Sequence, residues 1–234
     1  MVALPRVLRA AGRGAVEFLL PFHCLGCGKH GQSLCPDCII ALPRLQPPYC
    51  GRCAQPGTAS PCRRCAEAPL EVDGIRAPYL MEGAIREAVH GLKYRGVRAL
   101  APELAGLLAG HLEANPVPVD TLVPVPMHPS RQRHRGYNQS LLLARELGKR
   151  TGLPVEAEVL VMDRDSGPQV SVANREERWR NAQGSFQSAG GVMGRTLLLI
   201  YYVVTTGSTM SACAQALKEG GAASVWALVL ARES

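Results

Sequence analysis

The stretch RTLLLIYYVVTTGSTM, residues 195–210, decides the fold of this 234-residue chain. Its first half is an apolar run typical of a strand that is buried on both faces of a parallel sheet. Its second half, Thr-Thr-Gly-Ser-Thr, predicts a tight turn in which Gly207 lets the backbone approach a ligand. A helical pattern follows, so the free N–H groups of that helix face the turn. A strand, a glycine turn and a helix N-terminus in this order indicate a phosphate site.

Strands and helices alternate from about residue 72 to the end of the chain. The sequence predicts strands over residues 75–81, 121–125, 155–162, 197–204 and 224–230, and helices over residues 84–92, 100–112, 138–149, 175–181 and 210–218. This alternation favours a mainly parallel sheet with right-handed crossovers and ligands at its carboxyl edge. We therefore expect an α/β domain over residues 72–234, preceded by an amphipathic segment (residues 1–22) and a cysteine-rich module (residues 23–70).

Eight of the nine cysteines form four Cys-x-x-Cys pairs: Cys24/Cys27, Cys35/Cys38, Cys50/Cys53 and Cys62/Cys65. Both thiolates of one pair reach a single ion, and two pairs complete a closed, tetrahedral structural site. A disulfide framework would need an oxidising compartment, but we recognise no cleavable signal peptide and no apolar run of 18 residues. The sequence therefore predicts a double zinc ribbon with two structural zinc ions, whose folding depends on metal. Chain-order and interleaved pairing both stay open. The ninth cysteine, Cys213, is expected in the core.

The basic charge of the chain is concentrated near its N-terminus. The formal net charge is +7, with 13 Lys+Arg against 7 Asp+Glu in residues 1–100 and 13 against 12 in residues 101–234. Two four-thiolate zinc sites would each carry about −2 and reduce the total to about +3. The charge is therefore weak evidence for DNA binding. Arg6, Arg9 and Arg13 lie among apolar residues, which predicts a short helix that packs on the zinc module or a second subunit, or touches a membrane or nucleic acid.

Two further segments support a family resemblance. Residues 123–140 read VPVPMHPSRQRHRGYNQS, and residues 92–96 read LKYRG. The longer segment resembles the ComF (competence protein F) branch of the type I phosphoribosyltransferase-like proteins, where Pro-x-Pro-x-His precedes spaced arginines and Arg-Gly-aromatic-Asn-Gln. With Gln169, Arg178, Asn181 and the cysteine module, the resemblance extends over nearly the whole chain.

The resemblance implies a type I phosphoribosyltransferase-like fold and a set of binding residues. The 5′-phosphate of phosphoribosyl pyrophosphate (PRPP) would be held by Thr205, Thr206, Gly207, Ser208 and Thr209. Its pyrophosphate would be held by a loop containing Lys93, Tyr94 and Arg95, and magnesium would accompany it. The substrate loop would comprise Arg131, Arg133, Arg135, Gly136, Asn138 and Gln139. Without the resemblance, the arginine stretch is equally well interpreted as a solvated basic loop.

One departure concerns the catalytic position. Family members carry two acidic residues immediately before the phosphate turn, whereas this chain has Tyr201 and Tyr202. A phenol is neutral at pH 7 and is a poor ligand for Mg²⁺. The two rings are either ordinary strand aromatics turned to opposite faces of the sheet, or one ring covers the ribose position. We expect phosphate affinity to persist and transferase turnover to be lost.

Two residues of the ComF-like segment have open roles. His128 is flanked by prolines and is interpreted as a structural histidine rather than a catalytic base. Tyr137 either caps the adjacent helix or stacks on a base.

Three functions follow from these observations. The favoured one is a ligand-sensing or adaptor protein of natural competence, which binds PRPP or a related phosphate and contacts DNA-uptake proteins. The second is an active phosphoribosyltransferase that transfers to a nitrogen nucleophile. The third is a zinc-ribbon protein that binds single-stranded DNA, for which only Phe22 and Tyr49 lie in or beside the ribbon. The expected location is the cytoplasm, with the membrane periphery as an alternative. The sequence leaves open whether the chain forms a homodimer.

Overall fold

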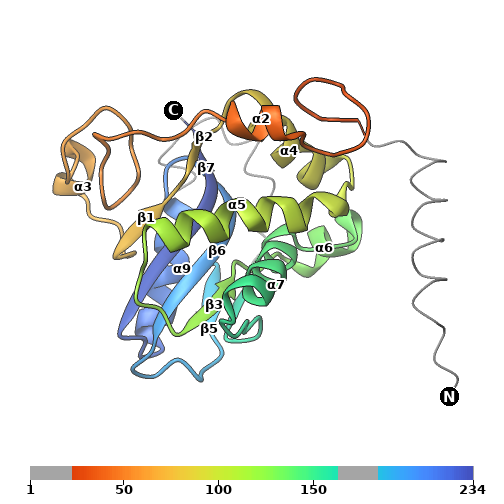
Figure 1. Ribbon diagram of the computed structural model, residues 1–234. Helices are drawn as coiled ribbons and strands as arrows, with labels where there is room; N and C mark the ends of the chain where they lie inside the picture. The colour runs from red at the N-terminus through yellow and green to blue at the C-terminus, as the bar shows by residue number, and fades with distance from the viewer. Residues whose placement is uncertain (1–22, 163–183, 234) are drawn as a thin grey trace, which may run out of the picture.

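The computed structural model describes residues 23–162 and 184–233. Its main sheet contains β1 (Gly74–Arg76), β2 (Tyr79–Leu80), β3 (Thr121–Pro124), β6 (Thr196–Val204) and β7 (Ser224–Arg232). The strand order is β1-β7-β6-β3, β2 also pairs with β7, and every pairing is parallel (Figure 1). The expected α/β class with a mainly parallel sheet is confirmed. The predicted segment 1–22, the predicted helix 175–181 and Gln169, Arg178 and Asn181 lie outside the described residues.

Helices cover both faces of this sheet. One face carries α4 (Gly83–Tyr94), α5 (Ala101–Ala114) and α7 (Gln139–Thr151), and the other carries α9 (Ser208–Glu219). The two-residue period of β6 explains this division. Leu197 and Leu199 pack in the core beneath α9, whereas Leu198 and Ile200 pack in the core beneath α4, α5 and α7. Cys213 is fully buried in the α9 core, as expected.

Three secondary-structure expectations need correction. The strand predicted over 75–81 is divided into β1 and β2, with Pro78, which has no N–H to donate, between them. The strand predicted over 155–162 is reduced to β4 (Leu160–Met162), which pairs antiparallel with β5 (Phe186–Ser188). The alternative of a basic loop at the arginine stretch is wrong, because α6 (Pro129–Arg135) forms there. Proline suits its first turn, and His128 Nδ1 accepts the Ser130 N–H at 3.3 Å as the N-cap.

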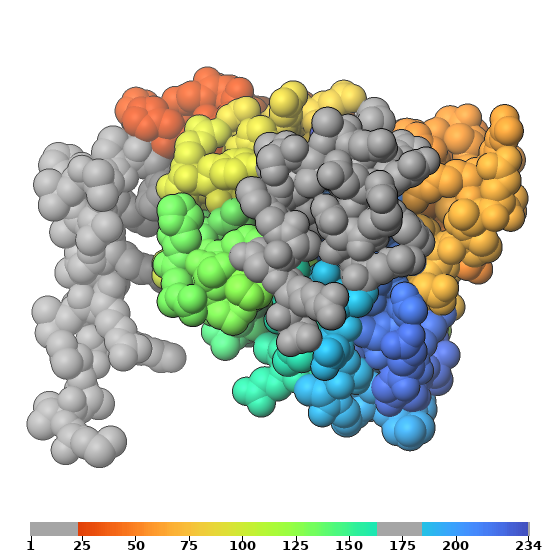
Figure 2. All heavy atoms as spheres, turned by 180° about the vertical axis from the view of Figure 1, so that it is seen from behind, coloured from red at the N-terminus to blue at the C-terminus, as the bar shows by residue number. Residues whose placement is uncertain are grey.

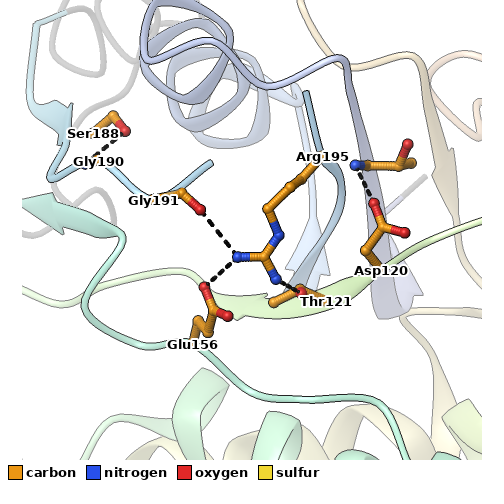
Figure 3. Close-up of polar contacts among 8 residues, drawn as sticks. Asp120, Thr121, Glu156, Ser188, Gly190, Gly191 and Arg195 are labelled. Atoms are coloured by element: carbon orange, nitrogen blue, oxygen red, sulfur yellow. Dashed lines mark hydrogen bonds and ion pairs between the residues drawn. The ribbon is translucent and has the colours of Figure 1, made fainter. Parts of the chain in front are cut away.

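A polar network joins β6 to β3 at the edge of the sheet where both strands begin (Figure 3). The Arg195 guanidinium donates to the Glu156 carboxylate at 2.8 Å, to the Gly191 carbonyl at 3.0 Å and to the Thr121 hydroxyl. The N–H of Thr196 donates to an Asp120 carboxylate oxygen at 2.6 Å. The opposite, carboxyl edge is therefore the one left for a ligand.

The cysteine-rich segment occupies two separate places on the sheet domain. Its first part contains α2 (Pro36–Ile40) and lies close to α4, whereas its second part contains α3 (Arg63–Glu67) and lies on the side of β1 (Figure 1). From behind, Figure 2 shows the orange second part against the blue C-terminal elements. Over the described residues, no helix combines the length and apolarity that a membrane crossing requires.

Candidate functional site

The loop between β6 and α9 has the geometry expected of a phosphate cradle. Gly207 adopts a left-handed conformation (φ 80°) and is the N-cap of α9. The Thr206 hydroxyl accepts the Ser208 N–H at 3.3 Å and lies 2.7 Å from the Ser208 hydroxyl. The loop thus presents the N-terminus of a 12-residue helix at the carboxyl edge of the sheet. We call residues 205–209 the phosphate loop.

Two adjoining cavities open at this edge. The larger, about 280 Å³, is lined by the entire phosphate loop and by the end of α4. The smaller, about 160 Å³, is lined by the β3–α6 connection, part of α6 and the start of α7. Residues common to both cavities are Lys93, Tyr94, Tyr201, Tyr202 and Thr209. The tyrosine pair therefore stands at the centre of the cleft rather than at its rim.

The two tyrosines interact with each other. Their ring centroids are 4.3 Å apart, and the Tyr201 hydroxyl donates to the Tyr202 hydroxyl at 3.2 Å. Tyr201 packs against the α9 core and Tyr202 against the α4 core, so the rings start from opposite faces of the sheet. Burial, followed by the neighbouring Tyr202, raises the pKa of Tyr201 well above its ordinary value. Tyr201 is therefore an uncharged hydroxyl at neutral pH.

The charge lining the cleft is mainly positive. Lys93 Nζ lies 4.8 Å from the Tyr94 ring centroid and 5.4 Å from that of Tyr202. Lys93 has no ion pair with a carboxylate of the described chain. Arg131 and Arg135 line the smaller cavity. Glu233 is the one carboxylate among the described residues that line the two cavities. A cleft of this composition favours anions.

Several residues implied by the resemblance do not reach the cleft. Arg95 pairs with Glu87, and neither Arg95 nor the exposed Arg133 is among the described residues that line these two cavities. Arg133 is two positions from Arg131 and from Arg135 on α6, whereas those two are four apart and share a face. Gly136 ends α6, and the fully buried Gln139 begins α7. The loop expected over residues 93–96 is helical in its first half, because α4 continues through Tyr94.

The ComF-like segment also contributes structural contacts. Asn138 lines the smaller cavity and caps α7, because its side-chain oxygen accepts from Ser140 N at 2.9 Å and its amide donates to the Val125 carbonyl at 3.0 Å. Tyr137 is buried, and its hydroxyl donates to the Leu92 carbonyl. Leu92 is in the last turn of α4, so Tyr137 satisfies a carbonyl at the C-terminus of that helix rather than capping α7, which follows it in the sequence.

Some lining residues carried no recognised sequence signal. They are Met81, Val89 and His90 in the larger cavity and Met127, Met162 and Phe186 in the smaller one. His90 had one usable signal, because it precedes Lys93 by three positions in a helix and so shares its face. The others come from separate elements that only the fold brings together.

The eight paired cysteines form two clusters, grouped in chain order. The first cluster is Cys24, Cys27, Cys35 and Cys38, and the second cluster is Cys50, Cys53, Cys62 and Cys65. Within each, all four sulfur atoms lie within 4.8 Å of one another. Sulfur–sulfur distances of 3.6 Å (Cys27–Cys35) and 3.7 Å (Cys53–Cys62) match the ~3.8 Å that a tetrahedron with Zn–S bonds of about 2.3 Å requires. Both clusters can hold a metal ion.

Backbone N–H groups favour the thiolate form in each cluster. The Cys35 N–H donates to Cys24 Sγ and the Cys62 N–H to Cys50 Sγ, both at 3.3 Å. Burial raises the pKa of Cys24 and Cys50, but backbone N–H donors outweigh it and lower each pKa to about 6. Thiolates are the form that binds metal.

Two curated proteins are similar to this chain over most of its length. The DNA utilization protein YhgH of Escherichia coli K12 is 30% identical over 208 residues, which cover 86% of this chain and 90% of the relative. The competence protein ComFC of Streptococcus pneumoniae is 27% identical over 203 residues, covering 86% and 88%. The chain belongs to the ComF family. No family model matches it.

One solved structure shows a weaker likeness. Glutamine PRPP amidotransferase from B. subtilis, complexed with ADP and GMP, is 21% identical. The match covers 57% of this ComF-family chain and 26% of that chain, with a TM-score of 0.39. A likeness at this level carries no assignment of ligand or reaction.

Proposed function

We propose that this ComF-family protein binds a phosphate-bearing ligand, PRPP or inorganic pyrophosphate, in the cleft between the phosphate loop and α4, and does not use it for efficient phosphoribosyl transfer. The observation that carries this proposal is the position of Tyr201 and Tyr202. They are shared by both cavities, so the groups that replace the family's acidic pair stand where the ligand would lie.

The remaining residues suit anion binding. Backbone N–H groups at the start of α9 and the hydroxyls of the phosphate loop would hold a terminal phosphate. Lys93 lines both cavities and would balance the second charged group, aided by Arg131 and Arg135 in the smaller cavity. Each of these contacts stabilises a bound phosphate, and none of them supplies a base or a nucleophile.

Transfer from PRPP needs negative charge at the position that Tyr201 and Tyr202 occupy in this cleft. The reaction breaks the bond between the anomeric carbon and pyrophosphate and develops positive charge on the ribose. Carboxylates stabilise that charge and hold Mg²⁺, whereas neutral phenols do neither. Among the described residues, the groups that can hold a metal are the two cysteine clusters, and none is at the phosphate loop. Within residues 23–162 and 184–233, Glu233 is the one carboxylate lining the cleft, and it does not make up a magnesium site by itself.

Zinc is the metal that fits the two cysteine clusters. Four thiolates at tetrahedral spacing form the closed type of site that holds a fold together and leaves no position for a substrate. We assign both clusters a structural role.

The cellular role proposed here is in DNA uptake, as an adaptor that responds to the phosphate ligand. It is supported by the names of two relatives, a DNA utilization protein and a competence protein. Protein partners suit the ribbon better than stacked bases, since its Tyr49 is half-buried. Cytoplasmic location, membrane contact through residues 1–22, single-stranded DNA binding and pairing with a second copy are parts of this proposal that need separate tests.

Calorimetric titration with PRPP, with and without Mg²⁺, tests the proposal. The wild-type chain should bind PRPP with an affinity that Mg²⁺ does not strengthen. The double variant Tyr201→Asp, Tyr202→Asp should gain Mg²⁺-dependent binding of about tenfold or more, since two carboxylates restore ligands for the ion. Wild-type binding that Mg²⁺ tightens, with release of pyrophosphate when a nitrogen nucleophile is added, would contradict it. Lys93→Gln should weaken PRPP binding, whereas Lys149→Gln, which removes the same charge at an exposed position of α7, should not.

A further inference from the structure

The second cysteine cluster contacts the back of the phosphate loop. Arg64 occupies the third position of the Cys62–Cys65 pair, on α3, and its Nη2 donates to the Thr206 carbonyl. These two residues are separated by 142 positions in the sequence. The contact therefore joins the metal-binding part of the chain directly to the backbone of the cradle.

The other pair of the second cluster supports the same region. Arg52 is likewise at the third position of its pair, Cys50–Cys53, and its Nη1 donates to the Leu70 carbonyl at 3.0 Å. Leu70 packs against Gly207, where an added Cβ would lie 2.9 Å from Leu70 Cδ1. The next residue, Glu71, donates its N–H to the Ser211 hydroxyl on α9 at 3.0 Å. Two arginines and one leucine thus support the loop from the side of the cluster.

The Arg64 contact fixes the direction of a peptide group that the ligand would use. In a planar trans peptide, the C=O and the following N–H point in opposite directions. Because Arg64 holds the Thr206 C=O on the cluster side, the Gly207 N–H is directed away from the cluster. Gly207 lines the larger cavity, and its N–H has no acceptor in the described parts of the chain. That N–H is therefore available to an anion.

We propose that Arg64 is a positioning residue of the anion site, and that the second cysteine cluster and the phosphate loop form one functional unit. Arg64 does not touch the ligand. It holds the Thr206–Gly207 peptide in the orientation that presents an N–H to phosphate. This inference rests on the proposed function, because it concerns the same cleft, and it adds that the part of the ribbon around the second cluster helps to set the affinity of that cleft.

The adjacent arginine provides a matched control. Arg63 has the same charge and the same helix, but it is exposed and pairs with Glu67 at 2.8 Å. Arg63→Met and Arg64→Met remove the same charge at neighbouring positions of one five-residue helix. A difference between the two variants therefore reports the contact to Thr206 rather than general electrostatics.

The test measures pyrophosphate affinity, zinc content and the backbone amide NMR signals of residues 205–209 in the full chain. Arg64→Met should weaken pyrophosphate binding about tenfold and shift the Gly207 amide signal, with two zinc ions retained per chain. This loss corresponds to about 1.4 kcal/mol, near the lower end of the roughly 1.5–3 kcal/mol usual for a hydrogen bond to a charged group. Arg63→Met should change affinity less than twofold. Arg64→Lys should restore part of the affinity, since an ammonium can also donate to the carbonyl.

Three outcomes separate the explanations. If wild-type protein binds pyrophosphate and Arg64→Met binds it equally well, the inference is overturned and the proposed function stands. Equal weakening by Arg63→Met also overturns it, because charge alone would then explain the effect. If the wild type does not bind pyrophosphate or PRPP, the proposed function fails. The NMR signals then decide whether Arg64 holds the loop, and an unchanged Gly207 signal in Arg64→Met overturns that as well.

Discussion

The same four-cysteine motif occurs twice in this chain, in two different environments. In the first cluster Cys27 is exposed and Cys38 half-buried, whereas all four cysteines of the second cluster are buried. The first cluster segment packs on α4, where Gly26 lies close to Ala84. The second belongs to the same core as α9 and the sheet. A repeated motif therefore does not imply a repeated role, and what each cluster packs against decides what its loss would disturb.

Replacing one metal-binding cysteine should have the largest effect on stability, and the size of this effect should differ between the two clusters. Cys62→Ser in the second cluster should unfold much of the sheet domain or lower its melting temperature by about 10 °C or more, which corresponds to roughly 3–5 kcal/mol or more in a chain of this size. Cys27→Ser in the first cluster should release one zinc and lower the melting temperature by roughly half as much or less. Thermal unfolding with zinc analysis measures both. Equal losses would remove the distinction between the clusters.

Gly207 tests the close approach between the second cluster segment and the phosphate loop. Gly207→Ala combines an unfavourable positive φ with a Cβ placed 2.9 Å from Leu70, so it should cost about 2–3 kcal/mol of unfolding free energy and abolish pyrophosphate binding. Gly194→Ala is the control, because Gly194 also has a positive φ (68°) but no atom near its added Cβ. It should cost only about 1 kcal/mol. Equal costs in urea unfolding would mean that backbone strain alone is responsible.

The smallest expected difference in stability is between substitutions of two aspartates, Asp73 and Asp37, and this difference depends on pH. Burial acts to raise the pKa of Asp73, but the Lys218 ammonium, the Val225 N–H and the Ser224 hydroxyl outweigh it and lower that pKa. A lowered carboxyl pKa stabilises the fold above the unfolded value of about 4, and this stabilisation is lost as the pH falls through the folded value. Asp73→Asn should therefore cost about 1 kcal/mol at pH 7, discounted for partial exposure, and progressively less as the pH is lowered toward the folded pKa of the carboxyl.

Asp37, beside the first cluster, is the matched control for Asp73. It pairs with Lys29 at 2.9 Å, but both side chains are largely exposed. Asp37→Asn should leave the urea midpoint nearly unchanged across the same pH range, because exposed ion pairs contribute little. A pH-dependent loss in Asp37→Asn as large as that in Asp73→Asn would contradict the account.

Much of the fold followed from sequence because its signals are local. The apolar run of β6, the glycine turn and the helical pattern of α9 adjoin one another, and each Cys-x-x-Cys pair is complete within four residues. The helix α6 was missed because its charged residues lack an apolar face, and its N-terminus depends on a His128 cap. The Arg64–Thr206 contact could not be predicted, since nothing in either segment indicates a partner 142 positions away. For the same reason, the sequence could not predict that the second cluster belongs to the core of the sheet domain.

We infer that the second cluster and the phosphate loop act together, whereas the first cluster is separate. Pyrophosphate affinity measured against bound zinc, as a chelator removes the metal stepwise, tests this most directly. The exposed first cluster should lose its ion first, with affinity unchanged within twofold, and binding should vanish with the second ion. A fall in affinity that accompanies loss of the first ion would contradict the claim.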